Sequence, residues 1–272
     1  MINSLLKAID ILELFSPDCP RLSLHEISAR LNLPKSTAHN LLRTLLSRGL
    51  IEKVDGDHYA LGTTIISLTQ AVRINVELRD RAAPLLRELA DTCPESVLMA
   101  IKDGYYSLYI YAVESPRRLQ ARTAVGDRVP MHCTAIGKAI LAFLPWDEVE
   151  EIITHVGMPP STDATITEMP AMLRELDLIH QRGISIDRQE HEAATFCIGA
   201  PIFNASGRVI AACSVSGPDP EIIGSRLEQI SQRVLHTSQN ISRLMGYVPT
   251  RNGLVVTRTA VEIRPKWHKE AN

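Results

Sequence analysis

The sequence contains no run of about 18 apolar residues, the minimum for a membrane-spanning helix, within its 272 residues. The first fifteen residues, MINSLLKAIDILELF, have acids among the apolar positions, and no small-residue cleavage site follows them. This pattern is not that of a signal peptide. We therefore expect a cytoplasmic protein that has no membrane partner.

Paired cysteines are also missing. The five cysteines are odd in number and scattered, and none forms a CxxC pair or a Cys/His cluster with zinc spacing. Such a set is typical of reduced thiols in a cytoplasm, and it indicates neither a metal site nor a cofactor. The cysteines are Cys19, Cys93, Cys133, Cys197 and Cys213.

A large charge of one sign is the third absence. The net charge of −2 gives the chain no general attraction to nucleic acid, so any DNA affinity must come from a local patch. Hydrophobic residues make up 45% of the chain and charged residues 22%, as in an ordinary soluble globular protein. The length is sufficient for two modest domains.

One stretch lacks acids altogether, because residues 34–49 include three basic residues and no acidic one. A capping box at Ser23 and Glu26 predicts the start of a helix that runs to about residue 31, where Asn32-Leu33-Pro34 ends it. A second helix is predicted over 35–48. Two short helices joined by a tight turn form a helix-turn-helix unit.

The first half of this second helix has hydroxyl, amide and basic side chains, which suit hydrogen bonding to phosphates and base edges in a major groove. They are Lys35, Ser36, Thr37, His39, Asn40 and Arg43. Two short strands around Asp55-Gly56-Asp57 then predict a wing. The order of these features favours DNA binding over a helical domain whose polar face is only solvated.

Beyond this region the sequence predicts a helical connector and a second domain. In the connector, residues 62–91, Pro84 begins or kinks a helix. The order β-β-β-α-α-α-β-β-β-α then predicts an α/β domain around an antiparallel sheet, and residues 248–272 a loosely held tail. The predicted strands are 96–102, 107–113, 119–123, 184–187 and the two of a hairpin within 187–218; 126–130 is a loop; the helices are 131–145, 147–154, 168–182 and 221–245.

A set of polar residues lies among the apolar ones of the 187–218 hairpin. Asp187 and Cys197 precede or begin its first strand, and Ser214 and Ser216 share one face of its second strand. Aligned hydroxyls on an apolar strand either bond each other or face a ligand, and spacing leaves both interpretations open. Small residues at 133–135 begin a helix that either binds an anion or packs closely on the sheet.

Several short motifs follow one another in order along residues 1–247. They are LPKST at 33–37, YALG at 59–62, PMHCTAIGKA at 130–139, GISID at 183–187, CIGAP at 197–201 and SVSGP at 214–218. Through these motifs the chain resembles the IclR family of bacterial transcriptional regulators. The resemblance implies an α+β protein with an N-terminal winged helix-turn-helix domain (1–62), a helical linker (63–91) and a C-terminal GAF/profilin-like α/β effector domain with an antiparallel sheet (92–247).

The resemblance further implies a regulator and not an enzyme. Its partners would be a double-stranded DNA operator and a small organic acid effector, and it would assemble as a homodimer or tetramer. We expect a repressor, rather than an activator, of a catabolic operon. The implied effector-binding residues are Cys133, Thr134, Ala135, Asp187, Cys197, Ser214, Val215 and Ser216.

Some positions depart from the family pattern. Around the pocket, Gln189 stands where a second acid is usual, and Ala194 replaces a glycine, which reaches positive φ at lower cost. Phe196 adds bulk beside Cys197. We therefore expect the ligand of this chain to differ at the 188–196 loop. The pair His39-Asn40 also differs from the family's arginine-containing pairs, so the operator sequence does not follow from the resemblance.

The polar set suits a small acid or keto acid, with the ligand carboxylate on backbone N–H groups and hydroxyls. An ionised Asp187 would repel that carboxylate, so we expect Asp187 at the other end of the ligand.

Two rival functions remain open. One is a thiol enzyme, with Cys197 or Cys133 as nucleophile and His132 or His191 as base. The other is a metal sensor that uses these four side chains. Against both, no residue that would orient a base is evident, the metal spacing is absent, and His191 is expected to be a solvated loop residue.

Overall fold

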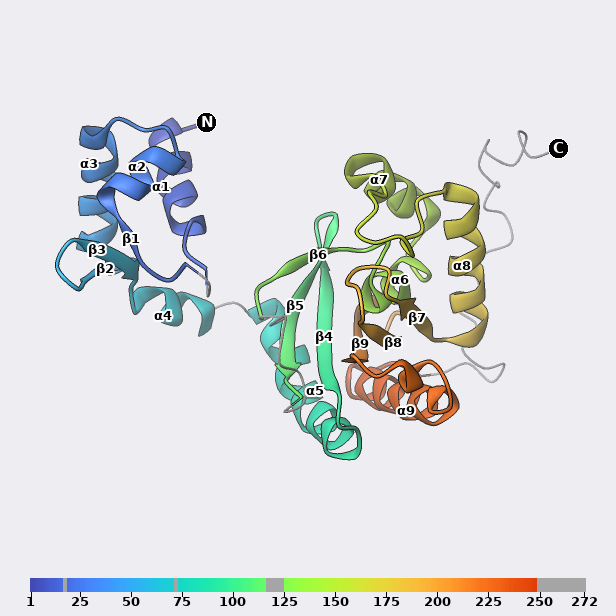
Figure 1. Ribbon diagram of the computed structural model, residues 1–272. Helices are drawn as coiled ribbons and strands as arrows, with labels where there is room; N and C mark the ends of the chain where they lie inside the picture. The colour runs from blue at the N-terminus through green and yellow to red at the C-terminus, as the bar shows by residue number, and fades with distance from the viewer. Residues whose placement is uncertain (17–18, 71–72, 116–124, 249–272) are drawn as a thin grey trace. The chain divides into compact units, whose positions relative to one another are not determined.

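The computed structural model of the chain describes residues 1–16, 19–70, 73–115 and 125–248, with side chains outside 70–76 (Figure 1). The chain forms two compact units, Met1–Val76 and Glu77–Asn272. Within the described residues, no helix is both long enough and apolar enough to span a membrane.

The N-terminal unit packs helices and a small antiparallel sheet of order β1-β3-β2 around one core. Ile11, Ile27 and Leu42, one from each of the first three helices, are fully buried in this core. The elements of the unit are α1 (Asn3–Glu13), β1 (Leu22–Ser23), α2 (Leu24–Arg30), α3 (Lys35–Ser47), β2 (Ile51–Val54), β3 (His58–Leu61) and α4 (Thr64–Gln70).

The turn between α2 and α3 follows from a few local hydrogen bonds. The predicted capping box is confirmed, because Ser23 Oγ accepts from the Glu26 N–H and the Glu26 carboxylate accepts from the Ser23 N–H. At the other end of α2, Asn32 has a φ of 49°, and Ser28 Oγ donates to the Leu33 carbonyl at 2.6 Å. These bonds fix the tight turn, and the predicted winged helix-turn-helix fold is confirmed.

The connector differs from its prediction at Pro84. A single helix, α5 (Arg73–Thr92), includes Pro84 in its interior, so the prediction that Pro84 might begin a helix is wrong. A proline removes one backbone donor and crowds the preceding turn. Packing offsets this cost, because Ala82 and Leu86 on either side of the proline are fully buried.

The second unit contains a six-stranded antiparallel sheet of order β6-β5-β4-β9-β8-β7. The predicted strand at 119–123 lies outside the described residues, and a short strand, β6, forms where a loop was predicted, because its residues pair with β5. The strands are β4 (Ser96–Asp103), β5 (Tyr106–Val113), β6 (Arg128–Pro130), β7 (Ser185–Arg188), β8 (Phe196–Phe203) and β9 (Val209–Gly217).

Helices cover both faces of this sheet (Figure 1). One hydrophobic core lies between the sheet and α6 (Ala135–Leu141), α7 (Trp146–Val156) and α8 (Met169–Arg182), and the other between the sheet and α5 and α9 (Leu227–Leu244). Along β9, Ala212 belongs to the first core, and Cys213 and Val215 belong to the second. Ser214 and Ser216 therefore face α6, as the strand alternation predicted.

Two helix starts also differ from their predictions. The last helix begins at Leu227 and not near residue 221, because Asp219 caps a separate 3₁₀ turn at Pro220–Ile222. The helix predicted over 131–145 is shorter, because the Thr134 hydroxyl accepts from the Gly137 N–H and caps α6 there.

Candidate functional sites

The first candidate site is the outward face of α3. Its buried residues are Ala38, Leu42 and Leu45, which hold the helix against the core of the N-terminal unit. Thr37 is half-buried, and the other predicted DNA-contacting residues are exposed: Lys35, Ser36, His39, Asn40 and Arg43. The structure thus presents these side chains on the surface of one helix that has no acidic residue.

A groove of about 410 Å³ adjoins this face. To the predicted DNA-contacting residues its lining adds two with nitrogen donors, His25 from the start of α2 and Lys53 from the wing, together with the acidic Asp57. The Lys53 ammonium lies 5.7 Å from the centroid of the Tyr59 ring, which holds it beside the groove. The groove is lined by Ser23, Leu24, His25, Lys35, His39, Lys53, Asp57 and Tyr59.

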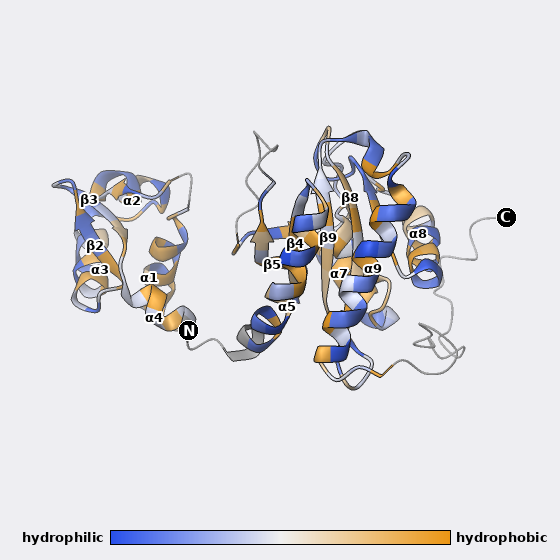
Figure 2. Ribbon diagram, turned by 90° about the horizontal axis from the view of Figure 1, so that it is seen from below, coloured by the Kyte–Doolittle hydropathy of each residue, from blue (hydrophilic) through white to orange (hydrophobic). Residues whose placement is uncertain are grey.

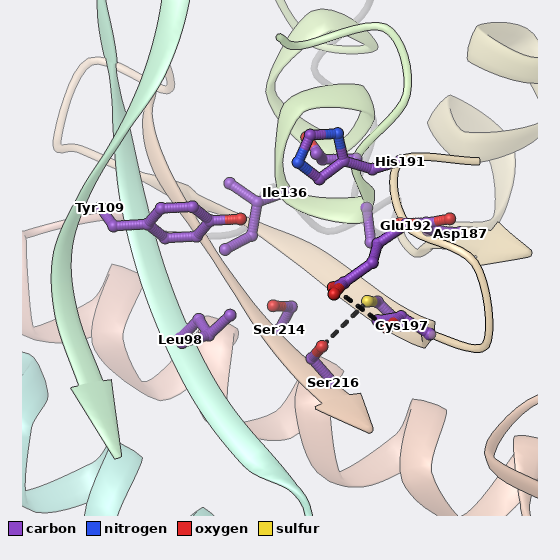
Figure 3. Close-up of a pocket in the computed structure, with 12 residues that line it drawn as sticks. Leu98, Tyr109, Ile136, Asp187, His191, Glu192, Cys197, Ser214 and Ser216 are labelled. Carbon is purple, nitrogen blue, oxygen red and sulfur yellow. Dashed lines mark hydrogen bonds between the residues drawn. The ribbon is translucent and has the colours of Figure 1, made fainter. Parts of the chain in front are cut away.

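The second candidate site is a small cavity between the sheet and the start of α6 (Figure 3). Six of the eight predicted effector-binding residues line it, namely Thr134, Ala135, Asp187, Cys197, Ser214 and Ser216. The cavity volume is about 30 Å³, which is room for one or two water molecules.

Sheet register explains why distant residues meet at this cavity. Asp187 on β7 pairs with Cys197 on β8, and Cys197 pairs with Ser216 on β9, so the three form one row across adjacent strands. Cys197 Sγ donates to Ser216 Oγ at 3.2 Å. The row therefore combines both interpretations of the sequence: its members bond one another, and they also line the cavity.

The other two predicted residues, Val215 and Cys133, do not line the cavity. The Val215 side chain is buried in the core on the opposite face of the sheet, because strand residues alternate in direction. Cys133 Sγ is buried 3.6 Å from His191 Nδ1 and 3.9 Å from Ser161 Oγ. We correct the expectation that the Val215 side chain reaches the ligand.

Several lining residues were missed. Leu98, Tyr109 and Ile136 form an apolar wall, and the Tyr109 hydroxyl points toward the cavity in Figure 3. Leu98 and Tyr109 come from β4 and β5, about a hundred residues before the hairpin, and only strand pairing could have placed them there. The alternation of residues along each strand could have predicted which face of the sheet these two side chains share, but not which strand lies beside them.

The segment 188–195, here called the pocket loop, contributes His191, Glu192 and Thr195 to the cavity lining. The expectation that His191 is a solvated loop residue is wrong, because its side chain is half-buried against the cavity. Thr195 Oγ1 donates to Glu192 Oε2 at 3.2 Å, which orders the end of the loop. Burial lowers the pKa of His191, so at neutral pH this imidazole is uncharged.

Asp187 is nearly fully buried, and burial raises its pKa from 3.8 to about 7. The Glu190 N–H donates to Asp187 Oδ1 at 2.7 Å, which acts in the opposite direction but does not cancel the effect of burial. Near neutral pH a large fraction of Asp187 is therefore protonated. In that form it can donate a hydrogen bond to a ligand carboxylate, so the repulsion expected from an ionised Asp187 is reduced.

Two of the positions that depart from the family pattern, Gln189 and Ala194, touch each other. Gln189 and Ala194 both have positive φ, 64° and 56°, and Gln189 Oε1 accepts from the Ala194 N–H at 2.9 Å. Left-handed backbone disfavours alanine. The glutamine side chain thus supports, by a hydrogen bond, the conformation that a glycine would adopt without it.

The rival functions find little support in the electrostatics of this site. Burial raises the pKa of the Cys133 thiol to about 11 and lowers the pKa values of His132 and His191, so at neutral pH Cys133 is a neutral thiol beside neutral imidazoles and is a poor nucleophile. Among the described residues, no group of three or more His, Cys, Asp or Glu side chains could hold a metal ion.

Family models match most of the chain. A model of the IclR helix-turn-helix domain matches residues 4–55, and a model of the C-terminal region of the bacterial transcriptional regulator IclR matches residues 70–243.

Individual relatives match over nearly the whole length. The HTH-type transcriptional repressor AllR of Klebsiella pneumoniae is 30% identical over 250 residues, 91% of either chain. The crystal structure of IclR from Thermotoga maritima is 31% identical with a TM-score of 0.77, over 91% of this chain and all of that one. An IclR homologue from Microbacterium hydrocarbonoxydans, solved with 4-hydroxybenzoate, is 23% identical with a TM-score of 0.81, over 89% and 98% of the two chains.

Proposed function

Because the chain belongs to the IclR family and is a DNA-binding transcriptional regulator and not an enzyme, we propose that it is a repressor that senses a small organic acid. The acid binds in the cavity of the second unit and changes the affinity of α3 for operator DNA. A catabolic operon is the proposed target, since a repressor released by an acid allows that acid to be degraded.

The observation that carries the proposal is the chemistry of the cavity. Two hydroxyls, Ser214 and Ser216, and Asp187, whose raised pKa of about 7 allows the protonated form at neutral pH, face one small space whose opposite wall is apolar. Hydroxyls and a protonated carboxyl can all donate hydrogen bonds, and a carboxylate is the ligand group that accepts several of them at once. The Tyr109 side of the cavity suits the carbon skeleton of the acid.

Two relatives support this choice. The Microbacterium homologue was solved with 4-hydroxybenzoate, which is an organic acid, and AllR of Klebsiella pneumoniae is named as a repressor.

Self-association is part of the proposal. The exposed side of α1 has an apolar stripe, Ile2, Leu5, Leu6 and Ile9, whose exposed fractions are 40% or more. These positions are one helical turn apart and lie on one face. Figure 2 shows the hydrophobic colouring along this helix. A homodimer or tetramer would cover such a stripe.

We propose one function for each part of the chain: residues 1–62 bind DNA, 63–91 link the two domains and 92–247 bind the effector. The tail predicted over 248–272 lies, except for Val248, outside the described residues. A bacterial operator lies in the cytoplasm, and we propose that location for this protein.

The test begins with a thermal-shift screen of small carboxylic, keto and hydroxy acids, with the matching amides as controls. An acid that binds the folded state raises the melting temperature, and its uncharged amide does not. Any acid found is then added to fluorescence anisotropy titrations with the DNA upstream of the protein's own gene. We expect a change of 5- to 150-fold in DNA affinity, the usual range of allosteric coupling, about 1–3 kcal/mol.

The Ser214→Ala variant should keep DNA affinity and lose the thermal shift with the acid. Ser231→Ala is the matched control, because Ser231 Oγ is buried on α9 without a hydrogen-bond partner. A Ser214→Ala protein that keeps the full acid-induced shift would contradict the proposed site. No stabilisation by any acid in the screen would contradict the proposed ligand class.

A further inference from the structure

Lys138 is a fully buried lysine in a helix whose other residues are small or apolar. Its Nζ donates to both carboxylate oxygens of Glu190 at 2.6 and 2.8 Å, to the Ile186 carbonyl at 2.8 Å and to Glu175 Oε1 at 3.1 Å. A buried ion pair adds little stability compared with apolar side chains of similar size. The contacts of Lys138 therefore serve less to stabilise the fold than to hold one segment of the chain in place.

That segment is the pocket loop, and Glu190 is its anchor. The backbone N–H of Glu190 donates to Asp187, its carbonyl accepts from Thr165 Oγ1 at 2.6 Å, and its carboxylate accepts from Lys138. One residue therefore connects the cavity carboxyl, the segment before α8 and the buried face of α6. Glu190 is itself almost fully buried.

The rest of the loop is bonded mainly to itself. Gln189 contacts Ala194 through its side chain, as described above, and the Gln189 N–H donates to the Thr195 carbonyl at 3.1 Å. Outside Glu190, the loop is also held by Thr162 Oγ1, which donates to the Gln189 carbonyl at 2.6 Å, and by the contact of Cys133 Sγ with His191 Nδ1 at 3.6 Å. Both are neutral contacts, so the charge-assisted bond of Glu190 to Lys138 is the strongest of the described anchors of this loop.

The cavity under this loop is too small for an organic acid. Its volume of about 30 Å³ is far below the roughly 300–1,000 Å³ of typical ligand pockets. Three of the lining residues, His191, Glu192 and Thr195, belong to the loop, whereas the floor is held in the hydrogen-bonded strands β8 and β9. The other described lining residues belong to strands or to the capped start of α6, so the loop is the part of the lining whose displacement makes space for an organic acid at the lowest cost.

We propose that the ion pair between Lys138 and Glu190 is a latch that holds the pocket loop closed, and that ligand enters the cavity when this latch is released. Lys138 is a positioning residue, because it acts on the cavity through Glu190. The identity of the ligand rests on the proposed function, but the latch does not, and it can be tested without any ligand.

The test compares two carboxylates that share one lysine. Glu190→Gln removes the loop carboxylate, and Glu175→Gln removes the carboxylate that α8 provides to the same ammonium. Alkylation by iodoacetamide is followed for each cysteine by mass spectrometry. Cys197 reports access to the cavity, and Cys213, fully buried on the other face of the sheet, reports global unfolding.

In Glu190→Gln we expect Cys197 to be alkylated about tenfold faster or more, because a charge-assisted hydrogen bond to the loop is lost. Cys213 should keep its wild-type rate, and Glu175→Gln should leave both rates within about threefold. Hydrogen exchange should distinguish the two variants in the same way. The backbone amides of residues 190 and 194 should exchange faster than in the wild type in Glu190→Gln but not in Glu175→Gln.

Wild-type alkylation of Cys197 in Glu190→Gln, or an equal increase in Glu175→Gln, would overturn the latch. If Glu190→Gln instead labels Cys197 and Cys213 alike, the double variant Lys138→Met/Glu190→Gln decides, because it leaves no unpaired lysine in the interior. Selective labelling of Cys197 in the double variant supports the latch, and equal labelling of the two cysteines refutes it. DNA binding by the same variants tests the proposed function separately.

Discussion

The charge of Asp187 depends on its surroundings more than on its chemistry. Desolvation is the largest effect, the nearby Glu190 raises the pKa further, and Lys138 and the hydrogen bonds from Glu190 and Cys197 oppose them. With the pKa near 7, a small change in pH or a bound anion changes the protonation of this side chain. A carboxyl group of this kind can serve both as donor and as acceptor within one pocket.

The raised pKa predicts how stability depends on pH. A carboxyl whose folded pKa, about 7, exceeds its ordinary value of 3.8 stabilises the fold fully below pH 4, and this contribution is lost as the pH rises through 7. Asp187→Asn stays neutral throughout and can still accept from the Glu190 N–H. The variant should therefore gain stability over the wild type between pH 4 and pH 8, by about 1–3 kcal/mol.

Thermal or urea unfolding at several pH values measures this difference. Glu190, whose pKa burial also raises, is present in both proteins, so its contribution largely cancels in the comparison. A difference between variant and wild type that stays constant from pH 4 to pH 8 would show that Asp187 remains ionised.

At the scale of elements, α3 and the wing are defined by local sequence. The capping box at the start of α2 and the apolar stripe and acid-free face of α3 all lie within residues 23–47, so the sequence was sufficient to predict the helix-turn-helix. The contribution of His25 to the adjoining groove is different, because it depends on how the start of α2 packs beside α3 and β3.

The cavity was only partly predictable for a related reason. Ser214 and Ser216 could be assigned to one face from their spacing, but the position of Tyr109 depends on the pairing of β5 with β4 and of β4 with β9. The sequence made no prediction for Lys138, because its burial depends on two glutamates from other elements. Long-range contacts of this kind leave no periodic signal in a single sequence.

The α3 surface predicts a specific salt dependence. Each basic side chain that neutralises a DNA phosphate adds about 0.9 to the slope of log affinity against log salt concentration. Arg43→Ala should lower the affinity, and it should reduce the steepness of this slope by about 0.9, the contribution of one phosphate contact. Arg48→Ala is the matched control, because five residues along a helix turn its side chain about 140° away from that of Arg43. Equal loss of slope in the two variants would contradict the assigned face.

At the scale of the whole molecule, two separately packed units serve two kinds of partner. The core of the N-terminal unit supports the α3 face, and the core between the sheet and α6 of the second unit adjoins the cavity. A signal between DNA and ligand needs a change in assembly or in the connector. The exposed stripe on α1 makes assembly the feature to test first.

Substitution of the stripe should change the oligomeric state. We expect Leu5→Ser/Ile9→Ser to shift the protein to smaller species in sedimentation velocity and to weaken binding to a palindromic DNA site, since burial of each leucine or isoleucine contributes about 1.5–3 kcal/mol. Leu178→Ser on α8, an exposed leucine of the other unit, is the control. An unchanged distribution of species for the double variant would exclude α1 as the association surface.

The row of Asp187, Cys197 and Ser216 has a consequence for how this protein diversifies. Neighbouring strands lie about 4.8 Å apart, and backbone hydrogen bonds fix this spacing, so the distances between these polar groups cannot adapt to a new molecule. Evolution toward another ligand, or directed evolution in the laboratory, is therefore expected to proceed through substitutions at Gln189, Ala194 and Phe196, while the sheet residues stay the same.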